Sequence, residues 1–155
     1  METQKKKGRY QRIFHQLIEL LEKPGDTDAR MSTVAAVLHH KMDDFFWTGF
    51  YCLNKGELIV KTYQGPVACQ LLEKNQGVCW AGINEKKTII VPDVHKFPGH
   101  IACDPRSKSE IVVPLIDNHN KVIGVLDVDS SKLNAFDETD AEFLEKIVGL
   151  IYPKP

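Results

Sequence analysis

Apolar residues recur every three or four positions in three stretches of the chain, the spacing of helices with one buried face. The first stretch covers residues 10–21 and ends at a Pro-Gly pair, which favours a chain reversal. The second covers 31–42 and follows Asp26, which can cap a helix N-terminus, as can the threonine after it. The third covers 143–151 and follows Asp137, another capping residue. The pattern predicts two helices near the N-terminus and one near the C-terminus.

Between these helices the pattern changes to β-branched and aromatic residues with the alternation typical of strands. Strands are predicted over residues 45–53, 57–64, 88–91, 110–116 and 122–129. A helix of one or two turns is expected over 77–84, and the last two strands are expected to form a hairpin around 118–120. Residues 93–106 show no periodicity, and so long a loop in a compact domain is usually functional or disordered. The order of elements predicts an α+β fold with a largely antiparallel sheet.

The last predicted strand has two different faces. Alternation places Val122, Gly124, Leu126 and Val128 on one face and Ile123, Val125, Asp127 and Asp129 on the other. Both faces begin with apolar residues, so we expect the sheet to be covered on both sides. One of these covered faces ends in two carboxylates.

The preceding strand, over residues 110–116, can add a third carboxylate, Glu110, to this face, depending on how the two strands pair. A two-residue turn places Glu110 opposite Asp127 or Asp129, whereas a three-residue turn directs Glu110 to the other face. Three carboxylates packed together repel one another, and burial raises their pKa values further. The cluster is therefore either solvated at a strand end or a site that needs shared protons, an ammonium group or a metal ion.

Composition narrows the class of protein. A chain of 155 residues is about one domain. Its formal net charge of −1 argues against a dedicated nucleic-acid binder, and 43% hydrophobic residues argue against a disordered chain. The sequence has neither a secretory signal pattern nor an apolar stretch of membrane-spanning length, so we expect a cytoplasmic protein with no membrane partner. The basic stretch Lys5–Arg9 is expected to be a solvated helix start rather than a binding patch.

Four cysteines in such a chain suggest metal binding, catalysis or redox chemistry, or simply small buried side chains. No Cys-x2-Cys pair is present, although His95, His100 and Cys103 lie close enough in sequence to ligate a metal. Cys103 lies in the long loop, where His100 or a helix N-terminus can lower the pKa of its thiol. A reactive thiolate with other cysteines in reach predicts a cycle of sulfenic acid, disulfide and reduction. Cys52 lies mid-strand and is expected to be a packing residue.

The aromatic strand has two interpretations. Aromatic residues in strands are core residues by default. Trp47 and Tyr51 are four residues apart, so a regular strand directs both to the same face. There Trp47 forms a flat apolar wall that carries one N–H donor.

Seven short motifs in order resemble the free methionine-(R)-sulfoxide reductases. They are Phe46–Tyr51, Gly65–Cys69, Gly77–Cys79, Val91–His95, Phe97–Asp104, Ser109–Pro114 and Gly124–Ser130. Members of that family are single GAF-domain enzymes. The resemblance implies one GAF domain over residues 1–155, with a central antiparallel sheet, helices packed on one face and ligand-covering loops on the other.

The resemblance also implies roles for particular residues. Cys103 matches the catalytic cysteine, Cys69 the usual resolving cysteine, and Cys79 a second cysteine able to enter the disulfide relay. Trp80 stands where the family more often has glycine, which predicts a shifted Cys79 or a narrower pocket.

Five further positions match the family's substrate site. Glu110, Asp127 and Asp129 correspond to carboxylates that hold the substrate. Trp47 and Tyr51 correspond to residues that line the pocket for its methyl sulfoxide end. Free methionine sulfoxide carries an ammonium group that such carboxylates neutralise, whereas a peptide-bound residue normally lacks one.

The activity implied is reduction of free L-methionine-(R)-sulfoxide through a cysteine sulfenic acid and an intramolecular disulfide, which thioredoxin then reduces. The resemblance implies no organic cofactor and no metal. The expected partners are the free amino acid, a thioredoxin-like reductant and a second copy of the chain, with no nucleic acid and no membrane. Two alternatives are a non-enzymatic GAF module that binds a small ligand and a thiol redox sensor without a methionine substrate.

Overall fold

A computed structural model describes residues 2–23, 25–100 and 103–153; Pro24 and residues 101–102 of the loop motif lie outside this range. The strands are β1 (Trp47–Asn54), β2 (Glu57–Gln64), β3 (Leu71–Leu72), β4 (Ile89–Val91), β5 (Ser109–Ile116) and β6 (Val122–Ser130). The helices are α1 (Thr3–Leu20), α2 (Thr27–Lys41), α3 (Gly77–Glu85) and α4 (Glu138–Val148), with a 3-10 turn at Val94–Lys96. The strands form one antiparallel sheet in the order β3-β2-β1-β6-β5-β4. The predicted α+β class is confirmed.

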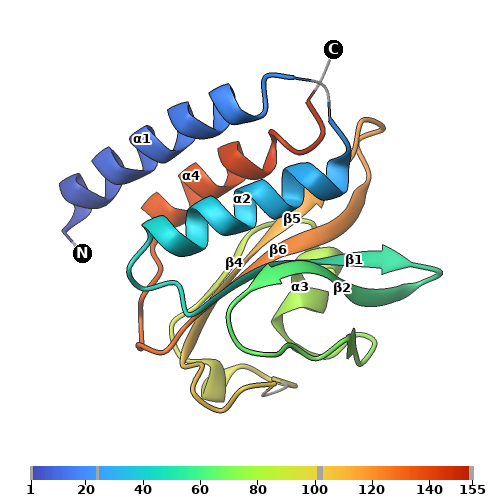
Figure 1. The fold of residues 1–155 in the computed structure, drawn as a ribbon. Helices are drawn as coiled ribbons and strands as arrows, with labels where there is room; N and C mark the ends of the chain where they lie inside the picture. Colours follow the sequence, from blue (N-terminus) through green and yellow to red (C-terminus); the bar gives the residue numbers. More distant parts are fainter. Residues whose placement is uncertain (1, 24, 101–102, 154–155) are drawn as a thin grey trace.

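Three helices cover one face of the sheet (Figure 1). α2 packs on β1 and β2, α4 packs on β5, and α1 lies across α2 and α4. The apolar stripes predicted from the sequence are the buried faces, from Met31 to Met42 in α2 and from Phe143 to Ile151 at the C-terminus. Asp26 and Asp137 cap these two helices as expected. Among the residues that the structure describes, no helix is long and apolar enough to cross a membrane.

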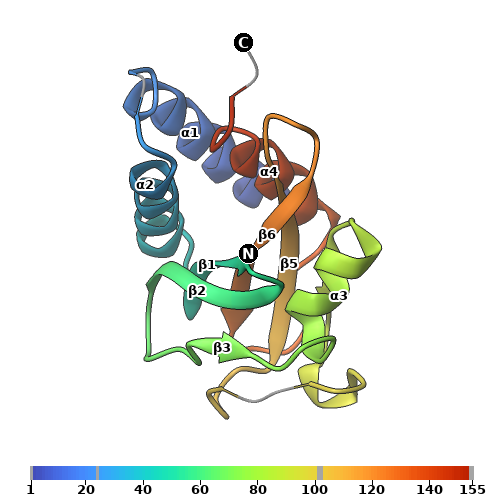
Figure 2. The ribbon, with the colours of Figure 1, turned by 90° about the vertical axis from the view of Figure 1, so that its right-hand side faces the viewer.

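The opposite face carries the remaining helix together with the loops (Figure 2). The expected arrangement placed helices on one face only, but α3 packs on β5 and β6 beside the covering loops. Its buried residues include Val78, Cys79, Trp80 and Ile83, which form a second apolar cluster separate from that under α1, α2 and α4. A helix this apolar needs burial along most of its surface, which explains its place between sheet and loops.

The last hairpin has the register that collects the carboxylates. Glu110 pairs with Asp129, and Asp127 lies two residues away on the same face. The connection spans residues 117–121, longer than the two-residue turn considered from the sequence, and a bulge restores the register. The bulge also reverses the faces that simple alternation predicts for two residues. Val122 packs with the α3 cluster, and Ile123 packs with the apolar cluster under α1, α2 and α4.

The basic start of α1 is only partly solvated. Lys6 is 6% exposed, contrary to expectation, because its Nζ donates to Asp140 Oδ2 of α4 at 2.7 Å. The Tyr10 hydroxyl donates to the other Asp140 oxygen, and Asp140 also accepts from the backbone N–H of Asp137. This buried network, Lys6–Tyr10–Asp140, therefore joins the N-terminal helix to the beginning of α4.

Candidate active site

A cavity of about 60 Å³ lies between the sheet, α3 and the covering loops. Seven of the eight predicted site residues line it: Trp47, Tyr51, Cys79, Cys103, Glu110, Asp127 and Asp129. The eighth, Cys69, is joined to the lining residue Cys103 by a disulfide. Residues from three strands, one helix and two loops thus meet at one place, although they are spread over more than half of the chain.

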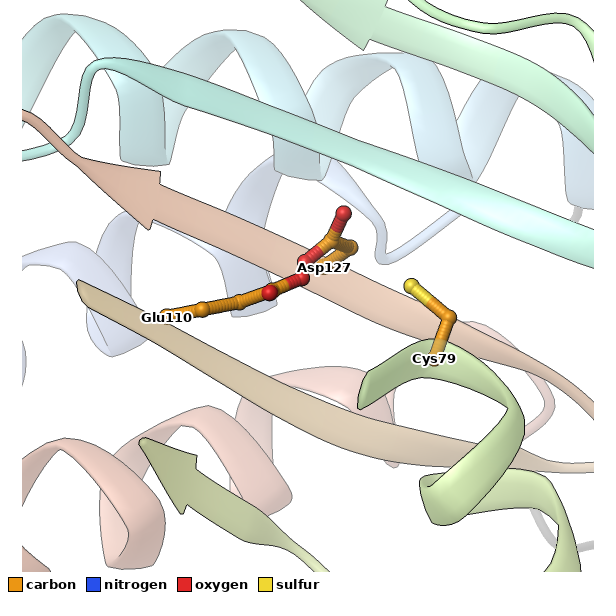
Figure 3. A group of neighbouring side chains, drawn as sticks. All are labelled: Cys79, Glu110 and Asp127. Atoms are coloured by element: carbon orange, nitrogen blue, oxygen red, sulfur yellow. The ribbon is translucent and has the colours of Figure 1, made fainter. Parts of the chain in front are cut away.

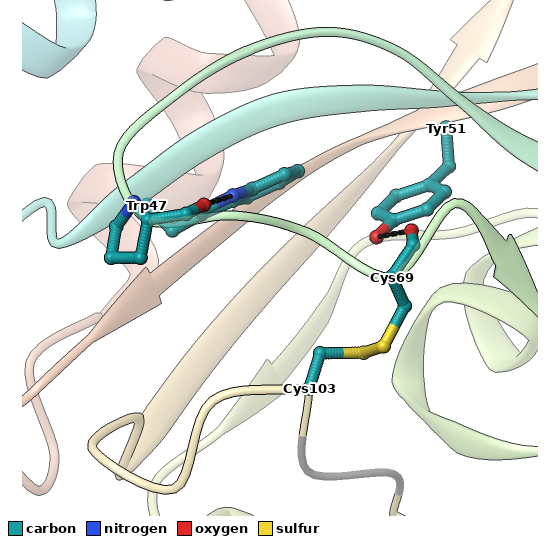
Figure 4. The surroundings of a disulfide bond; sticks show 5 residues. Trp47, Tyr51, Cys69 and Cys103 are labelled. Atoms are coloured by element: carbon teal, nitrogen blue, oxygen red, sulfur yellow. Dashed lines mark hydrogen bonds between the residues drawn. A yellow bond between two sulfur atoms is a disulfide. The ribbon is translucent and has the colours of Figure 1, made fainter.

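The disulfide between Cys69 and Cys103 closes the loop side of the cavity (Figure 4). The two Cα atoms are 5.6 Å apart, within the usual range for a disulfide, although the residues are 34 positions apart in sequence. Cys103 is exposed and Cys69 half-buried. A sulfur in a disulfide is not a thiolate ligand, so in this state the alternative metal site at His95, His100 and Cys103 lacks its cysteine.

Two aromatic residues of β1, Trp47 and Tyr51, hold the loop that carries Cys69. The rings of Trp47 and Tyr51 stack with centroids 5.8 Å apart, as expected for residues on one face of a strand. Trp47 Nε1 donates to the carbonyl oxygen of Pro66 at 3.0 Å, and the Tyr51 hydroxyl donates to the carbonyl oxygen of Cys69 at 2.8 Å (Figure 4). The aromatic wall of the cavity is therefore also the anchor of the disulfide loop.

Glycine at position 49 allows this wall to form. A Cβ atom placed on Gly49 would lie 2.6 Å from the Trp47 ring, closer than packed atoms approach. The missing side chain leaves room for Trp47 to lie between Tyr51 and Tyr63, whose ring centroid is 5.2 Å from that of Trp47. The local sequence Trp-Thr-Gly-Phe-Tyr thus encodes the orientation of the wall.

The three carboxylates form the anionic floor of the cavity. Glu110 and Asp127 are each 5% exposed, and Asp129 is half-buried. None of the three forms an ion pair with another residue in the described ranges. Burial, followed by repulsion from neighbouring carboxylates, raises the pKa values of Glu110 and Asp129 well above their usual range, and burial raises the pKa of Asp127. At neutral pH the cluster therefore holds protons or needs a bound cation.

Cys79, in α3, lies beside two of these carboxylates, Glu110 and Asp127. One ligand atom each of Cys79, Glu110 and Asp127 lies within 4.8 Å of the others, and all three residues are buried (Figure 3). The Cys79 thiol is free, and burial raises its pKa well above the usual value, which keeps it protonated. The structure thus pairs Cys103 with Cys69 and leaves Cys79 unpaired; its part in a disulfide relay stays a prediction.

Cys52 and Trp80 are not among the residues that line the cavity. Cys52 packs against the helical cluster, and burial raises its thiol pKa to about 11, in agreement with the expected packing role. Trp80 belongs to the α3 cluster and is not among the residues that line the cavity. Trp80 therefore does not narrow the cavity by direct contact, and its effect on the position of Cys79 stays a prediction.

The covering loop contributes side chains that the sequence did not assign to the site. Ser107 is 8% exposed and lines the cavity, but it lies between the loop without periodicity and the next predicted strand, where the sequence carries no signal for it. Arg106 Nη2 bonds Asp104 Oδ2 at 2.6 Å, and its guanidinium lies 4.9 Å from the centre of the Phe46 ring. These contacts tie the segment after Cys103 to the start of β1.

His100 also lines the cavity. Burial and the nearby His95 lower the pKa of His100, so its ring is neutral at pH 7. A neutral ring does not supply the positive charge that the sequence suggested for stabilising a Cys103 thiolate.

The chain resembles known proteins along most of its length. Residues 26–151 match the family model of the GAF domain. The free methionine-R-sulfoxide reductase of Saccharomyces cerevisiae is 50% identical over 111 residues, which cover 70% of this chain and 62% of that protein.

Solved structures give the same relationship at the level of the fold. The reduced form of the fRMsr of Staphylococcus aureus is 43% identical, covers 92% of both chains and superposes with a TM-score of 0.87. The free methionine-R-sulfoxide reductase of Neisseria meningitidis, solved in complex with its substrate, is 38% identical over 92% of this chain and 85% of that one, with a TM-score of 0.86. By sequence, fold and domain, the chain belongs to the GAF-domain family of free methionine-R-sulfoxide reductases.

Proposed function

We propose that this chain reduces free L-methionine-(R)-sulfoxide to methionine. The observation that carries the proposal is the placement of Cys103, in a disulfide with Cys69, in the same cavity as three buried carboxylates and an aromatic wall. A related reductase from Neisseria meningitidis was solved in complex with its substrate, and the fold is shared.

Each part of the cavity suits one part of the substrate. The ionised carboxylates among Glu110, Asp127 and Asp129 neutralise the ammonium group, which a methionine sulfoxide within a peptide normally lacks, and a carboxyl that keeps its proton is left for the sulfoxide oxygen. The indole of Trp47 and the ring of Tyr51 provide an apolar surface for the S-methyl group. The selectivity for the free amino acid therefore comes from buried negative charge that lacks an ion-pair partner among the described residues.

In the proposed reaction the Cys103 thiolate attacks the sulfoxide sulfur. A protonated carboxyl of the floor donates a hydrogen bond to the sulfoxide oxygen, since the raised pKa values keep protons in the cluster. The oxygen takes up a proton and passes from the substrate sulfur to Cys103 Sγ as its bond to the substrate sulfur breaks. Cys103 is then a sulfenic acid, and methionine is released. The Cys69 thiol then displaces water from the sulfenic acid and forms the Cys69–Cys103 disulfide.

An external dithiol returns the enzyme to its starting state. A thioredoxin-like protein attacks the disulfide, forms a mixed disulfide and leaves both cysteines as thiols. The exposed side of Cys103 makes this sulfur accessible from solvent. We place the reaction in the cytoplasm, where such reductants operate, with no organic cofactor or metal in the cycle and Cys79 as an alternative resolving thiol. A homodimer is the expected assembly.

The test is a coupled assay that follows NADPH oxidation with thioredoxin, thioredoxin reductase and resolved R and S sulfoxides, free and peptide-bound. We expect turnover with the free R form only, and loss of turnover in Cys103→Ser. Cys52→Ser, which alters a packing cysteine away from the cavity, is the matched control and should keep wild-type turnover. No turnover by the intact reduced wild type would exclude the proposal.

A second variant separates the reductase from a thiol redox sensor. Asp129→Asn removes one charge from the floor and leaves both disulfide cysteines in place. A reductase should lose at least tenfold in kcat/KM for methionine sulfoxide, while hydrogen peroxide should still form the Cys69–Cys103 disulfide at close to the wild-type rate. Equal effects on both reactions would favour the sensor.

A further inference from the structure

We propose that Cys79, Glu110 and Asp127 form a binding site for a thiophilic divalent cation of the Zn²⁺ type, and that occupation of this site inhibits the enzyme. The binding is independent of the proposed function, whereas the inhibition rests on it. The three ligand atoms, one from each residue, lie within 4.8 Å of one another (Figure 3). This group is the only set of three such ligands found in the part of the chain that the structure describes.

An independent observation points to a missing ligand at this place. Asp127 Oδ1 is buried and has no hydrogen-bond partner among the residues that the structure describes, while the whole residue is 5% exposed. Burying a carboxylate oxygen without a hydrogen-bond donor costs free energy of folding. Most buried polar atoms in folded proteins therefore have a hydrogen-bond partner. A cation beside Glu110 and Cys79 would give this oxygen a partner.

A bound ion would set the spacing of the three ligand atoms. A tetrahedral zinc ion with bonds of about 2.0–2.3 Å requires ligand atoms roughly 3.3–3.5 Å apart. The three ligand atoms lie within 4.8 Å of one another, so the side chains that are farther apart than zinc requires would have to move closer together when an ion binds. The cavity beside them leaves room for a water molecule as the fourth ligand.

The chemistry of the ligands selects the ion. A thiolate with two carboxylates favours Zn²⁺ or Co²⁺, whereas Mg²⁺ and Ca²⁺ prefer oxygen ligands alone. Binding requires loss of the thiol proton, so each ion bound releases protons to solvent. The disulfide leaves Cys79 free, so the site persists in the oxidised enzyme.

The site overlaps the place proposed for the substrate ammonium group. A bound cation would occupy Glu110 and Asp127 and would exclude that group by charge and by space. It would also hold Cys79 as a thiolate on the metal, out of reach of any disulfide relay. Inhibition should therefore be competitive with methionine sulfoxide.

The binding experiment uses the full chain in its oxidised form, in which Cys69 and Cys103 cannot ligate a metal. Co²⁺ is titrated while the near-ultraviolet thiolate-to-metal charge-transfer band is recorded, and Zn²⁺ is then added to displace it. We expect one equivalent of Co²⁺, displacement by Zn²⁺ and no effect of Mg²⁺. Cys79→Ser should abolish the band, and Asp127→Asn should weaken binding at least tenfold.

Cys52→Ser is the matched control, since Cys52 is the other free cysteine and packs on the opposite face of the sheet. It should bind Co²⁺ like the wild type. Circular dichroism of each variant checks the fold, and Glu110→Gln provides a second ligand variant if Cys79→Ser does not fold. Absence of the band in the wild type, or its survival in a folded Cys79→Ser protein, would overturn the site.

The inhibition experiment repeats the coupled assay at fixed free Zn²⁺ and rising sulfoxide concentration. We expect a higher KM with unchanged kcat. Inhibition that excess substrate does not relieve would overturn the inhibitory role. If the wild type binds Co²⁺ through Cys79 but reduces no sulfoxide, the metal site stands and the proposed reductase function fails.

Discussion

At the scale of single residues, Tyr51 serves two purposes. Its ring lines the cavity beside Trp47, and its hydroxyl holds the carbonyl oxygen of Cys69 at 2.8 Å. The hydrogen bond restrains the backbone of the proposed resolving cysteine, so the aromatic wall and the disulfide step are physically connected.

Tyr51→Phe should therefore separate the two roles. It keeps the apolar ring but removes a hydrogen bond worth roughly 0.5–1.5 kcal/mol. We expect disulfide formation to slow by about threefold to tenfold, with sulfenic acid accumulating at Cys103. Rapid quenching with dimedone followed by mass spectrometry measures this. Tyr63→Phe, which alters the other ring stacked on Trp47, should change the trapped fraction little; an equal rise in both variants would contradict the role of the hydroxyl.

Also at the residue scale, burial of the three carboxylates lowers the free energy of unfolding at neutral pH. Glu110 faces Asp127 and Asp129 from the sheet, Cys79 from α3 and Tyr51 from β1. Its raised pKa means that the folded protein keeps a proton which the unfolded chain loses above about its ordinary pKa, 4.5. The free energy of unfolding therefore falls as the pH rises above this value.

Glu110→Gln should remove part of this pH dependence. The amide is uncharged in both the folded and the unfolded chain, so folding no longer requires uptake of a proton at this position. We therefore expect a gain on the order of 1 kcal/mol at pH 7.5, or roughly 2–4 °C in Tm. Thermal melts of oxidised protein from pH 5 to pH 8 measure it. Glu57→Gln, at an exposed position on β2, should melt like the wild type. A variant less stable than the wild type at pH 7.5 would contradict proton uptake by Glu110 as a cost of folding.

At the scale of elements, the Lys6–Tyr10–Asp140 network fixes α1 to α4. Both partners of the ion pair are buried, with side-chain exposures of 8% and 1%. Asp140 also completes the capping box at the start of α4 with Asp137. The network lies on the helical face of the sheet, opposite the cavity, so it supports the fold rather than the site.

Asp140→Ala should therefore destabilise the protein without changing its chemistry. It leaves the buried Lys6 ammonium with only the more exposed Asp137, whose Oδ2 is 3.5 Å away. The loss should therefore be about 3 kcal/mol, the low end for a broken buried pair, and Tm should fall by roughly 10 °C. KM for the sulfoxide at 20 °C should stay at the wild-type value. Glu142→Ala breaks only the exposed pair with Lys146 on the same helix and should cost under about 1 kcal/mol. Similar losses in both variants would show that burial of the pair is unimportant.

At the scale of the whole molecule, the disulfide joins two covering loops that are 34 residues apart in sequence. Both loops lie on the α3 face, while the sheet beneath is held by its own strand pairing and by the helices of the other face. Reduction should therefore loosen the cover of the cavity and leave the scaffold intact.

The oxidised protein should melt above the reduced protein. Closing a loop of this length is worth about 3–4 kcal/mol in the chain-entropy estimate, or roughly 10 °C in Tm. Hydrogen exchange should rise on reduction in the covering loops around Cys69 and Cys103 and stay unchanged in β1, β5 and β6. Cys69→Ser should behave like the reduced wild type under oxidising conditions. Faster exchange throughout the sheet would contradict a scaffold independent of the disulfide.

Much of this fold follows from the sequence because its elements have strong local signals. The stripe from Met31 to Met42 and the capping residue Asp26 define α2, and the turn at Lys55 and Gly56 sets the β1–β2 hairpin. Helical periodicity, caps and tight turns depend on residues a few positions apart, so they can be predicted from the sequence alone. The motifs shared with the reductases likewise identify the family and most residues of the cavity.

The remaining features depend on contacts between distant segments. The bulge near Ile116 sets the faces of Val122 and Ile123, and strand alternation alone gives the wrong answer there. Burial of Lys6 requires α4 to lie beside α1, and inclusion of Ser107 in the cavity requires the loop to fold over β1. The sequence by itself determined the longer helices and strands, the family and the residues of the chemistry, but not the short strand β3 or the 3-10 turn at Val94–Lys96. Only the tertiary structure decided which cysteines pair and which carboxylates lose water, because bond formation and desolvation depend on distances between groups far apart in the chain.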